Sequence, residues 1–307
     1  MPVSQMIRLS HTAFPQRLLL LCLGALLFAC ANPEGVIFEG PSLFGSIYVE
    51  DSAKGLRTLM FERNGARQSV VKLGDPDHLE LSYARTVLAG LPLAGKMHRV
   101  LVLGLGGGSL PMFLHHNFPE ALIEVVEIDP AVVSVAKQFF DVREDEGLRI
   151  RLGDARSFVE ASAPGFYDLI IVDAFGANSV PAHLSTREFI LALRRAVVPE
   201  GVVIGNLWRR PFNAAYDSMV LTYLSVFEQN IVLDVPADVN SIVLALPRKA
   251  PINREILADM AGELARSRKF RVDLANIVNT AFKQVESMKL DGSVLRDQVI
   301  QERPLPR

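Results

Sequence analysis

Short apolar runs alternate with stretches of helical periodicity through the middle of the chain. The runs at residues 100–104 and 167–173 contain almost no polar alternation, which is typical of strands that are covered on both faces of a parallel sheet. An alternation of strands and helices predicts right-handed crossovers and one twisted sheet. We expect the strands of this sheet in seven segments, at residues 100–104, 122–127, 148–152, 167–173, 201–206, 230–235 and 241–246.

The residues before this region have a different pattern. Residues 36–73 contain β-branched and aromatic residues in partial alternation, and Asn64 and Gly65 separate two such runs. An Asn-Gly pair between strands predicts a hairpin with a type I′ turn, in which both central residues have positive φ. A helix is expected at residues 79–91. The predicted fold class is therefore α/β, with a Rossmann-like, doubly wound, mostly parallel seven-stranded sheet after a small N-terminal β domain.

Two helices of the central region have clear start signals. Asp129 precedes Pro130, and an N-cap acid followed by proline is typical of a helix N-terminus. Ser185 and Glu188 have the spacing of a capping box ahead of a helix at residues 189–197. Both signals support the predicted alternation of strands with helices.

The C-terminal region is predicted to be helical. Residues 256–265 and 274–288 have amphipathic patterns, and the polar tail after Asp291 is expected to fray. We therefore divide the chain into four parts, which are a targeting segment at residues 1–31, a small β domain with its linking helix at 34–95, the Rossmann-like domain at 96–248, and C-terminal helices with a tail at 249–307.

The first thirty-one residues resemble a targeting segment. Arg8 and Arg17 precede an apolar run at residues 18–29, which is shorter than the roughly 20 residues that span a bilayer and fits the core of a signal peptide. The tetrapeptide that ends at Cys30 resembles a bacterial lipoprotein box. We expect a protein that is exported or anchored to a membrane through this segment. The alternative is a cytoplasmic protein whose true start lies downstream.

Composition and charge argue against nucleic acid and metal ions as ligands. The formal net charge is −2 over 307 residues, so the chain has no bulk attraction to nucleic acid. Cys22 and Cys30 are its only cysteines, and none of its six histidines lies four residues from another. This pattern disfavours thiolate clusters and zinc sites. We expect neither a nucleic-acid partner nor a metal.

A glycine-rich turn follows the first strand of the predicted sheet. Gly104, Gly106 and Gly108 allow a tight turn and a close approach of a ligand to the backbone. The second strand ends at Glu127, twenty-one residues after Gly106, where a carboxylate can accept hydrogen bonds from both ribose hydroxyls. This pair of features predicts a nucleoside site. Ser109, which stands where a dinucleotide fingerprint has its last glycine, argues against a nicotinamide dehydrogenase.

Two further carboxylates follow the next two strands. Asp154 and Ala155 come after the third strand, where an acid can bind the exocyclic amine of adenine, and Asp173 ends the fourth. Taken singly, each acid could equally be a helix cap. Because the carboxyl ends of parallel strands meet at one edge of a sheet, we expect these groups to surround one ligand.

Four motifs of this region carry a family resemblance. They are Val-Leu-Val-Leu-Gly-Leu-Gly-Gly-Gly, Val-Val-Glu-Ile-Asp-Pro, Leu-Gly-Asp-Ala-Arg and Tyr-Asp-Leu-Ile-Ile-Val-Asp. They resemble the spermidine synthase family of the class I adenosyl-methionine-dependent transferases, and the similarity runs from Ser46 to Leu246.

The resemblance implies a transferase. Its family moves an aminopropyl group from decarboxylated S-adenosyl-methionine to a small amine, so the domain at 96–248 is expected to bind that nucleoside. The resemblance implies that Asp173 is catalytic, that Gln68 and Tyr83 lie on the acceptor side, and that the protein is a homodimer. The expected donor contacts are Gly104, Gly106, Gly108, Glu127, Ile128, Asp154, Ala155 and Asp173.

The sequence departs from the family pattern at three positions. Gly107 and Gly176 stand where the family has acids, and Arg85 replaces a glutamate. Intact S-adenosyl-methionine carries a carboxylate that Arg85 or the bare glycine loop at Gly107 could accommodate, so a methyltransferase is the first alternative. A non-catalytic binding module on the same fold is the second.

Overall fold

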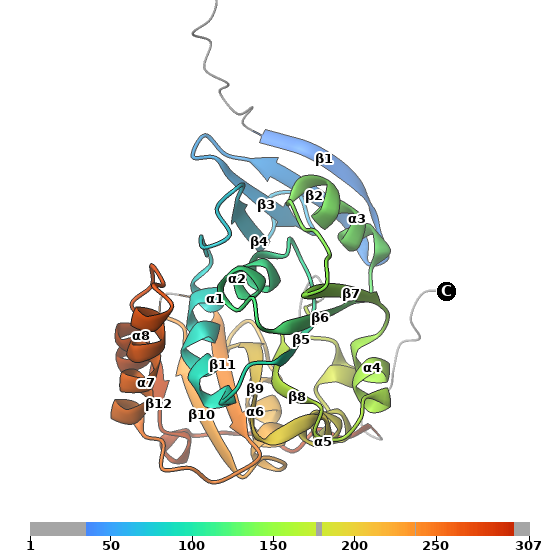
Figure 1. Ribbon diagram of the computed structural model, residues 1–307. Helices are drawn as coiled ribbons and strands as arrows, with labels where there is room; N and C mark the ends of the chain where they lie inside the picture. Colours follow the sequence, from blue (N-terminus) through green and yellow to red (C-terminus); the bar gives the residue numbers. More distant parts are fainter. Residues whose placement is uncertain (1–34, 176–179, 237, 298–307) are drawn as a thin grey trace, which may run out of the picture.

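Two β-sheets organise the protein in the computed structural model, which describes residues 35–175, 180–236 and 238–297 (Figure 1). The expected targeting segment at residues 1–31 lies outside the described residues. Within the described ranges, no helix is long and apolar enough to cross a membrane.

The small sheet is an antiparallel meander at the N-terminal end of the described chain, drawn in blue in Figure 1. The hairpin predicted at Asn64 and Gly65 is confirmed, but its type I′ turn is wrong. Asn64 has a φ of 60°, whereas Gly65 has no positive φ, and the Gly65 N–H donates to the Glu62 carbonyl at 3.0 Å. The four strands are β1 (Gly35–Ser42), β2 (Gly45–Asp51), β3 (Leu56–Met60) and β4 (Arg67–Lys72).

The large sheet has the strand order β12-β10-β11-β9-β8-β5-β6-β7. The five strands from β9 to β7 are parallel, and β11, β10 and β12 continue the sheet in antiparallel fashion. This arrangement confirms the doubly wound, mostly parallel sheet, and all seven predicted strands are present. The strands are β5 (Arg99–Leu103), β6 (Leu122–Glu127), β7 (Leu148–Leu152), β8 (Tyr167–Val172), β9 (Val197–Trp208), β10 (Gln229–Asp234), β11 (Asn240–Leu246) and β12 (Phe282–Lys283).

The short strand β12 corrects the helix predicted at residues 274–288. That helix ends at Ala281, because the next two residues pair with β10. The helix predicted at residues 79–91 likewise turns into a 3-10 helix at Leu88. The helices are α1 (Ser82–Val87), α2 (Ser109–Asn117), α3 (Pro130–Phe139), α4 (Ala155–Ala161), α5 (Arg187–Ala196), α6 (Tyr216–Leu224), α7 (Arg254–Ser267), α8 (Leu274–Ala281) and the 3-10 helices η1 (Leu88–Ala94), η2 (Ala182–Leu184) and η3 (Val285–Ser287).

One of the two predicted helix caps is confirmed. The Asp129 carboxylate accepts the Ala131 N–H at 2.8 Å, which caps α3. The capping box predicted at Ser185 is wrong, because Thr186 is the N-cap of α5 and its side chain accepts the Phe189 N–H. The hydroxyl of Ser185 instead donates to a backbone carbonyl in the preceding turn.

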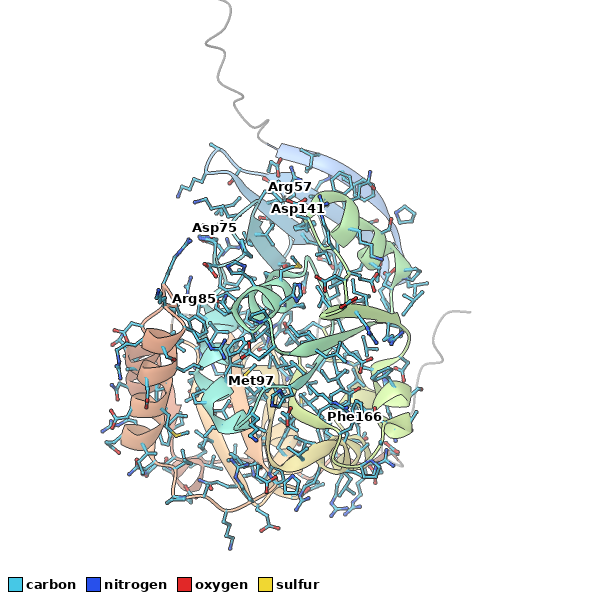
Figure 2. The ribbon with its side chains drawn as sticks, in the orientation of Figure 1. Arg57, Asp75, Arg85, Met97, Asp141 and Phe166 are labelled. Carbon is cyan, nitrogen blue, oxygen red and sulfur yellow. The ribbon has the colours of Figure 1, made fainter. Side chains whose placement is uncertain are left out.

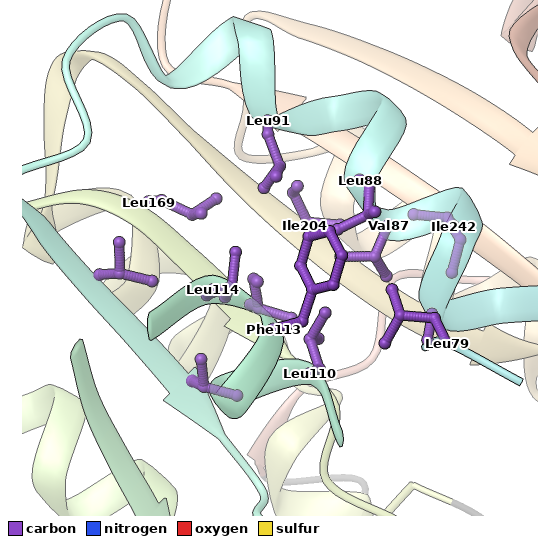
Figure 3. Packing of buried hydrophobic residues seen from close by; sticks show 14 of the residues in the cluster. Leu79, Val87, Leu88, Leu91, Leu110, Phe113, Leu114, Leu169, Ile204 and Ile242 are labelled. Carbon is purple, nitrogen blue, oxygen red and sulfur yellow. The ribbon is translucent and has the colours of Figure 1, made fainter. Parts of the chain in front are cut away.

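Alternate residues of each central strand face different halves of the core. In β5, Val100 and Val102 pack into one hydrophobic cluster, whereas Leu101 and Leu103 pack into the other. This pattern explains why the strand reads as a continuous apolar run. Figure 3 shows the first cluster, in which Phe113 of α2 meets side chains of α1 and η1 over the sheet.

Arg57 joins the small sheet to the large domain through a hydrogen bond, and an ion pair within the small sheet holds its side chain. The Arg57 guanidinium binds both carboxylate oxygens of Asp51 at 2.6 Å and donates to the Phe139 carbonyl at the end of α3 at 2.7 Å. Arg57 and Asp141 lie where the small sheet meets α3 (Figure 2). The contact fixes the small sheet above the carboxyl edge of the large one.

Residues 291–297 of the tail are held against α5 and α6, so the expected fraying is wrong for that stretch, and residues 298–307 lie outside the described ones. The backbone N–H groups of Asp291 and Leu295 donate to side chains of α6 at 2.8 and 3.0 Å. The Asp297 N–H donates to Glu188 of α5 at 3.1 Å. The sequence-based boundaries at residues 95 and 248 stay predictions.

Candidate active site

A cavity of about 1290 Å³ lies between the small sheet and the carboxyl edge of the large sheet. Its volume is large enough for a nucleoside and a second small molecule. Residues after four parallel strands line it together with Gln68 of β4 and Tyr83 of α1. The lining includes all the predicted site residues except Gly108, namely Gln68, Tyr83, Gly104, Gly106, Glu127, Ile128, Asp154, Ala155 and Asp173. Their roles toward a ligand stay predictions.

The glycine loop after β5 has backbone conformations that require glycine. Gly104 has a φ of +102°, and a Cβ there would lie 2.3 Å from the Asp173 carbonyl oxygen. Gly108 has a φ of +75°, and its Cβ would lie 2.3 Å from Val142. Gly108 therefore serves close packing at the start of α2 rather than the cavity wall.

Gly107 stands where the resembling family has an acid. A Cβ at this position would lie 2.8 Å from a Phe140 ring carbon and 3.0 Å from the Ser69 Cβ. Real Cβ atoms do not approach so closely, so an acidic side chain here would require Phe140 or Ser69 to move. Phe140 and Ser69 therefore pack so closely around this position that only glycine fits without a shift.

Glu127 links the glycine loop to the loop after β6. Its Oε2 accepts the Leu105 N–H and its Oε1 accepts the Asp129 N–H, each at 3.0 Å. Burial raises the pKa of Glu127, although these two hydrogen bonds act in the opposite direction. Because a carboxylate has about four acceptor positions, two remain for the hydroxyls of a ribose.

Asp154 caps α4 and also lines the cavity. Its Oδ1 accepts the Ser157 N–H at 2.8 Å, and its Oδ2 lies 2.9 Å from His183 Nε2. Burial alone would raise the pKa of Asp154, but the hydrogen bonds from Ser157 and His183 outweigh it and lower that pKa. The cap interpretation and the ligand interpretation are thus compatible. Sequence reasoning missed His183, which only the fold brings to Asp154.

Asp173 is the centre of a buried hydrogen-bond network. Asn206 Nδ2 donates to its Oδ1 at 2.8 Å, and the Tyr83 hydroxyl donates to its Oδ2 at 3.2 Å. Asn240 in turn donates to the Asn206 side chain at 2.8 Å. Burial raises the pKa of Asp173 to about 6, although the two hydrogen bonds act in the opposite direction. A carboxylate of this kind can accept a proton at neutral pH.

An aromatic wall adjoins Asp173. Phe175 and Trp208 stack with ring centroids 5.3 Å apart and an interplanar angle of 26°, and both line the cavity. Such a wall suits the apolar part of a ligand. The sequence contains no local signal that these two residues meet, because Phe175 follows β8 whereas Trp208 ends β9.

Acidic residues outnumber basic residues on the cavity wall. Among the described residues, seven carboxylates and two guanidinium groups line the cavity. One of these cations, Arg156, is bound by both carboxylate oxygens of Asp297, at 2.8 and 2.6 Å, so it adds little free positive charge. The excess of anions favours cationic ligands. The seven acids are Glu127, Asp129, Asp154, Glu160, Asp173, Asp238 and Asp297.

Arg85 does not face the cavity, where it was expected to bind the carboxylate of the donor. Its guanidinium donates to the carbonyls of Leu79 and Glu80 at 2.8 and 3.0 Å and to the Ser82 hydroxyl at 3.1 Å. Arg85 belongs to α1 and is absent from the cavity wall; its side chain is labelled in Figure 2. The expectation that Arg85 binds a donor carboxylate is therefore wrong, since these contacts hold the guanidinium elsewhere. Within the described ranges, no cluster of three His, Cys, Asp or Glu side chains forms a metal site.

Known proteins resemble this chain over most of its length. A polyamine aminopropyltransferase of Vibrio vulnificus is 33% identical over 248 residues, which are 78% of this chain and 82% of the relative. The family model for the spermine/spermidine synthase domain matches residues 81–214.

Solved structures have the same fold. A probable spermidine synthase from Corynebacterium glutamicum has a TM-score of 0.66 at 21% identity, over 84% of this chain and 99% of that one. Human methyltransferase-like protein 13, solved with SAH, has a TM-score of 0.56 at 27% identity, over 62% of this chain and 93% of that one. All these relatives are transferases or are named for transferase activities. Given the extent of the match to the Vibrio enzyme, the chain belongs to the spermine/spermidine synthase family.

Proposed function

We propose that this protein transfers an aminopropyl group from decarboxylated S-adenosyl-methionine to a small amine. The observation that carries the proposal is the position of Asp173. This buried carboxylate lies on the rim of an acidic cavity, is oriented by Tyr83 and Asn206, and has a pKa near 6. Family membership supports the same reaction.

The donor would lie across the carboxyl ends of the parallel strands. Glu127 has acceptor positions for the ribose hydroxyls, and Asp154 and Ala155 are placed for the adenine. The chain that carries the sulfonium would lie beside the glycine loop, where Gly104 and Gly106 line the cavity. The acidic wall attracts that positive charge.

The transfer step requires alignment and the loss of one proton. The lone pair of the amine nitrogen attacks the methylene carbon beside the sulfonium, the carbon–sulfur bond breaks, and its electron pair stays on sulfur as a neutral thioether nucleoside. A primary ammonium has a pKa of about 10, so the amine must lose a proton to react. Asp173 can take this proton and can hold the amine behind the carbon.

Methyl transfer from intact S-adenosyl-methionine is the second candidate. Gly107 lacks the acid that would bind an aminopropyl ammonium, and Arg67 lines the cavity where a donor carboxylate could meet it. Human methyltransferase-like protein 13 is also similar to this chain. This candidate differs from the first in the donor that binds.

Calorimetry with the two donors tests the proposal. The full-length chain is titrated with decarboxylated and with intact S-adenosyl-methionine, and we expect tighter binding of the decarboxylated form. Preference for the intact form would reject aminopropyl transfer. Binding of neither donor would favour the non-catalytic module.

Membrane attachment through residues 1–31 and assembly as a homodimer remain parts of the proposal. Export would conflict with a donor that is made in the cytosol, so the fate of this segment bears on the reaction. Sequencing the N-terminus of the mature protein decides whether the segment is removed. Size measurement of the purified protein by light scattering tests the dimer.

A further inference from the structure

Asp238 brings a carboxylate to the cavity from the turn between β10 and β11. Asp238 and the next two residues, Val239 and Asn240, all line the cavity. Its Oδ1 accepts the Val239 N–H at 2.7 Å. Among the residues that the structure describes, no Lys, Arg or His side chain forms a salt bridge with this carboxylate. It therefore has acceptor positions for a cationic ligand.

Arg209 holds this turn without neutralising Asp238. Its guanidinium pairs with Asp234 at 3.4 Å and donates to the backbone carbonyls of Val235 and Asp238. The Arg209 backbone N–H donates to the Val239 carbonyl at 2.7 Å. The turn is thus fixed through its backbone, and within the described part of the chain Arg209 leaves the Asp238 carboxylate at the cavity without a salt bridge.

Asp238 lies on the same side of the cavity as Asp173. The pKa of Tyr83 is raised first by burial, then by the charge of its partner Asp173, and also by the charge of Asp238. Asn240, two residues after Asp238, donates to Asn206, which donates to Asp173. The two carboxylates therefore flank one part of the cavity.

The aromatic wall connects these two carboxylates. Phe175 follows Asp173 by two residues, and it stacks on Trp208. Trp208 is paired with Asn240 across β9 and β11, next to the turn that carries Asp238. An acid, an apolar wall and a second acid match a ligand with an alkyl chain and an ammonium group at each end.

The sequence lacks an acid that the family resemblance leads us to expect near Asp173. The family resemblance implies two acids in the active-site loop, and this chain has Asp173 and then Gly176, which lies outside the described residues. We propose that Asp238 replaces the missing acid and binds the distal ammonium of an α,ω-diamine acceptor, while Asp173 holds the amine that attacks. The inference rests on the proposed function, because it assigns the acceptor of the same site. Asp238 is thereby a specificity-determining residue.

A comparison of two amines of equal chain length tests this role. The full-length chain is assayed with decarboxylated S-adenosyl-methionine and either 1,4-diaminobutane or 1-aminobutane. Loss of a charge-assisted hydrogen bond predicts that Asp238→Asn raises KM for the diamine roughly 10- to 100-fold, with kcat within about twofold. The kcat/KM for 1-aminobutane should stay within about twofold, because that amine has no distal ammonium.

Two further variants control the experiment. Glu228→Gln removes the same charge from an exposed residue at the other end of β10 and should leave both amines unaffected. Asp238→Glu keeps the charge and should restore most of the affinity for the diamine. Two results would overturn the inference. One is an equal loss of kcat/KM for both amines in Asp238→Asn, which would show that Asp238 only maintains the structure of the turn. The other is an unchanged KM for the diamine.

A binding measurement separates this inference from the proposed function. If the wild-type chain transfers nothing to either amine, the proposed function fails. Calorimetry of 1,4-diaminobutane with the wild type and with Asp238→Asn, each saturated with methylthioadenosine, then decides the inference alone. Binding at least roughly tenfold tighter to the wild type supports it, and equal affinity or absence of binding contradicts it.

Discussion

Burial of an ionised Asp173 should cost the folded protein stability. Asp173 is partly exposed to the cavity, yet desolvation by the surrounding protein raises its pKa to about 6, above the ordinary value of 3.8. Because the pKa is raised on folding, the folded state favours the neutral acid. The protein therefore loses stability as the pH rises from 3.8 to about 6, and the loss is constant above that range.

The variant Asp173→Asn removes this cost and fits the same partners. Its side-chain oxygen can accept from Asn206 and its NH₂ can donate to the Tyr83 hydroxyl, which now acts as acceptor. A difference of about two pKa units at 1.36 kcal/mol each predicts a gain of about 3 kcal/mol at pH 8 and only about 1 kcal/mol at pH 4.5. The gain should accompany a loss of transfer activity, as is common at active sites.

Urea unfolding followed by circular dichroism measures this effect. The free energy of unfolding is determined for the wild type and the variant at both pH values, together with Asp259→Asn. Asp259 is exposed on α7, so its variant should stay within about 0.5 kcal/mol of the wild type at either pH. The decisive quantity is the change in the variant's gain between the two pH values, about 2 kcal/mol. A difference that does not depend on pH would refute the view that Asp173 is a buried, costly carboxylate.

Three other predictions follow from the same structure. The kcat/KM of the wild type should fall as the pH drops below about 6, because Asp173 becomes protonated, and a profile that is flat to pH 5 would contradict this. Gly104→Ala should cost about 2 kcal/mol or more and weaken donor binding measured by calorimetry, whereas Gly153→Ala, whose Cβ meets nothing within 4 Å, should cost under about 1 kcal/mol. Arg57→Ala should lower the free energy of unfolding by about 3 kcal/mol, because it leaves Asp51 buried without its partner; a cost below about 0.5 kcal/mol in urea unfolding would show that the ion pair does not hold the small sheet.

The sequence was sufficient for the parts of the site that follow from local pattern. Glu127, Asp154 and Asp173 each stand at or just after the end of a predicted strand, and parallel strands bring their carboxyl ends to one edge. The strained backbone at Gly104 was likewise predictable, since a turn from strand to helix at this point favours glycine. These residues all line the cavity, as the strand pattern predicted.

The rest of the site depends on contacts between distant segments. Asn206 reaches Asp173 only because β9 lies beside β8, and Asn240 reaches Asn206 only because β11 returns antiparallel to β9. Asp238 enters the cavity through the same hairpin. No periodicity or spacing in the sequence encodes these pairings.

The errors in secondary structure have the same origin. The helix expected to reach residue 288 ends at Ala281, because pairing with β10 outweighs its amphipathic pattern. The polar tail after Asp291 is ordered because its backbone finds acceptors on α5 and α6. In both cases tertiary contacts override a local preference.

Identification of the nucleoside product tests the central claim most directly. The purified full-length chain is incubated with 1,4-diaminobutane and an equal mixture of decarboxylated and intact S-adenosyl-methionine, and the products are separated and weighed by mass spectrometry. Aminopropyl transfer predicts methylthioadenosine together with an amine that is heavier by one aminopropyl group, and neither product should form with Asp173→Asn. Formation of S-adenosyl-homocysteine and a methylated acceptor instead would contradict the account.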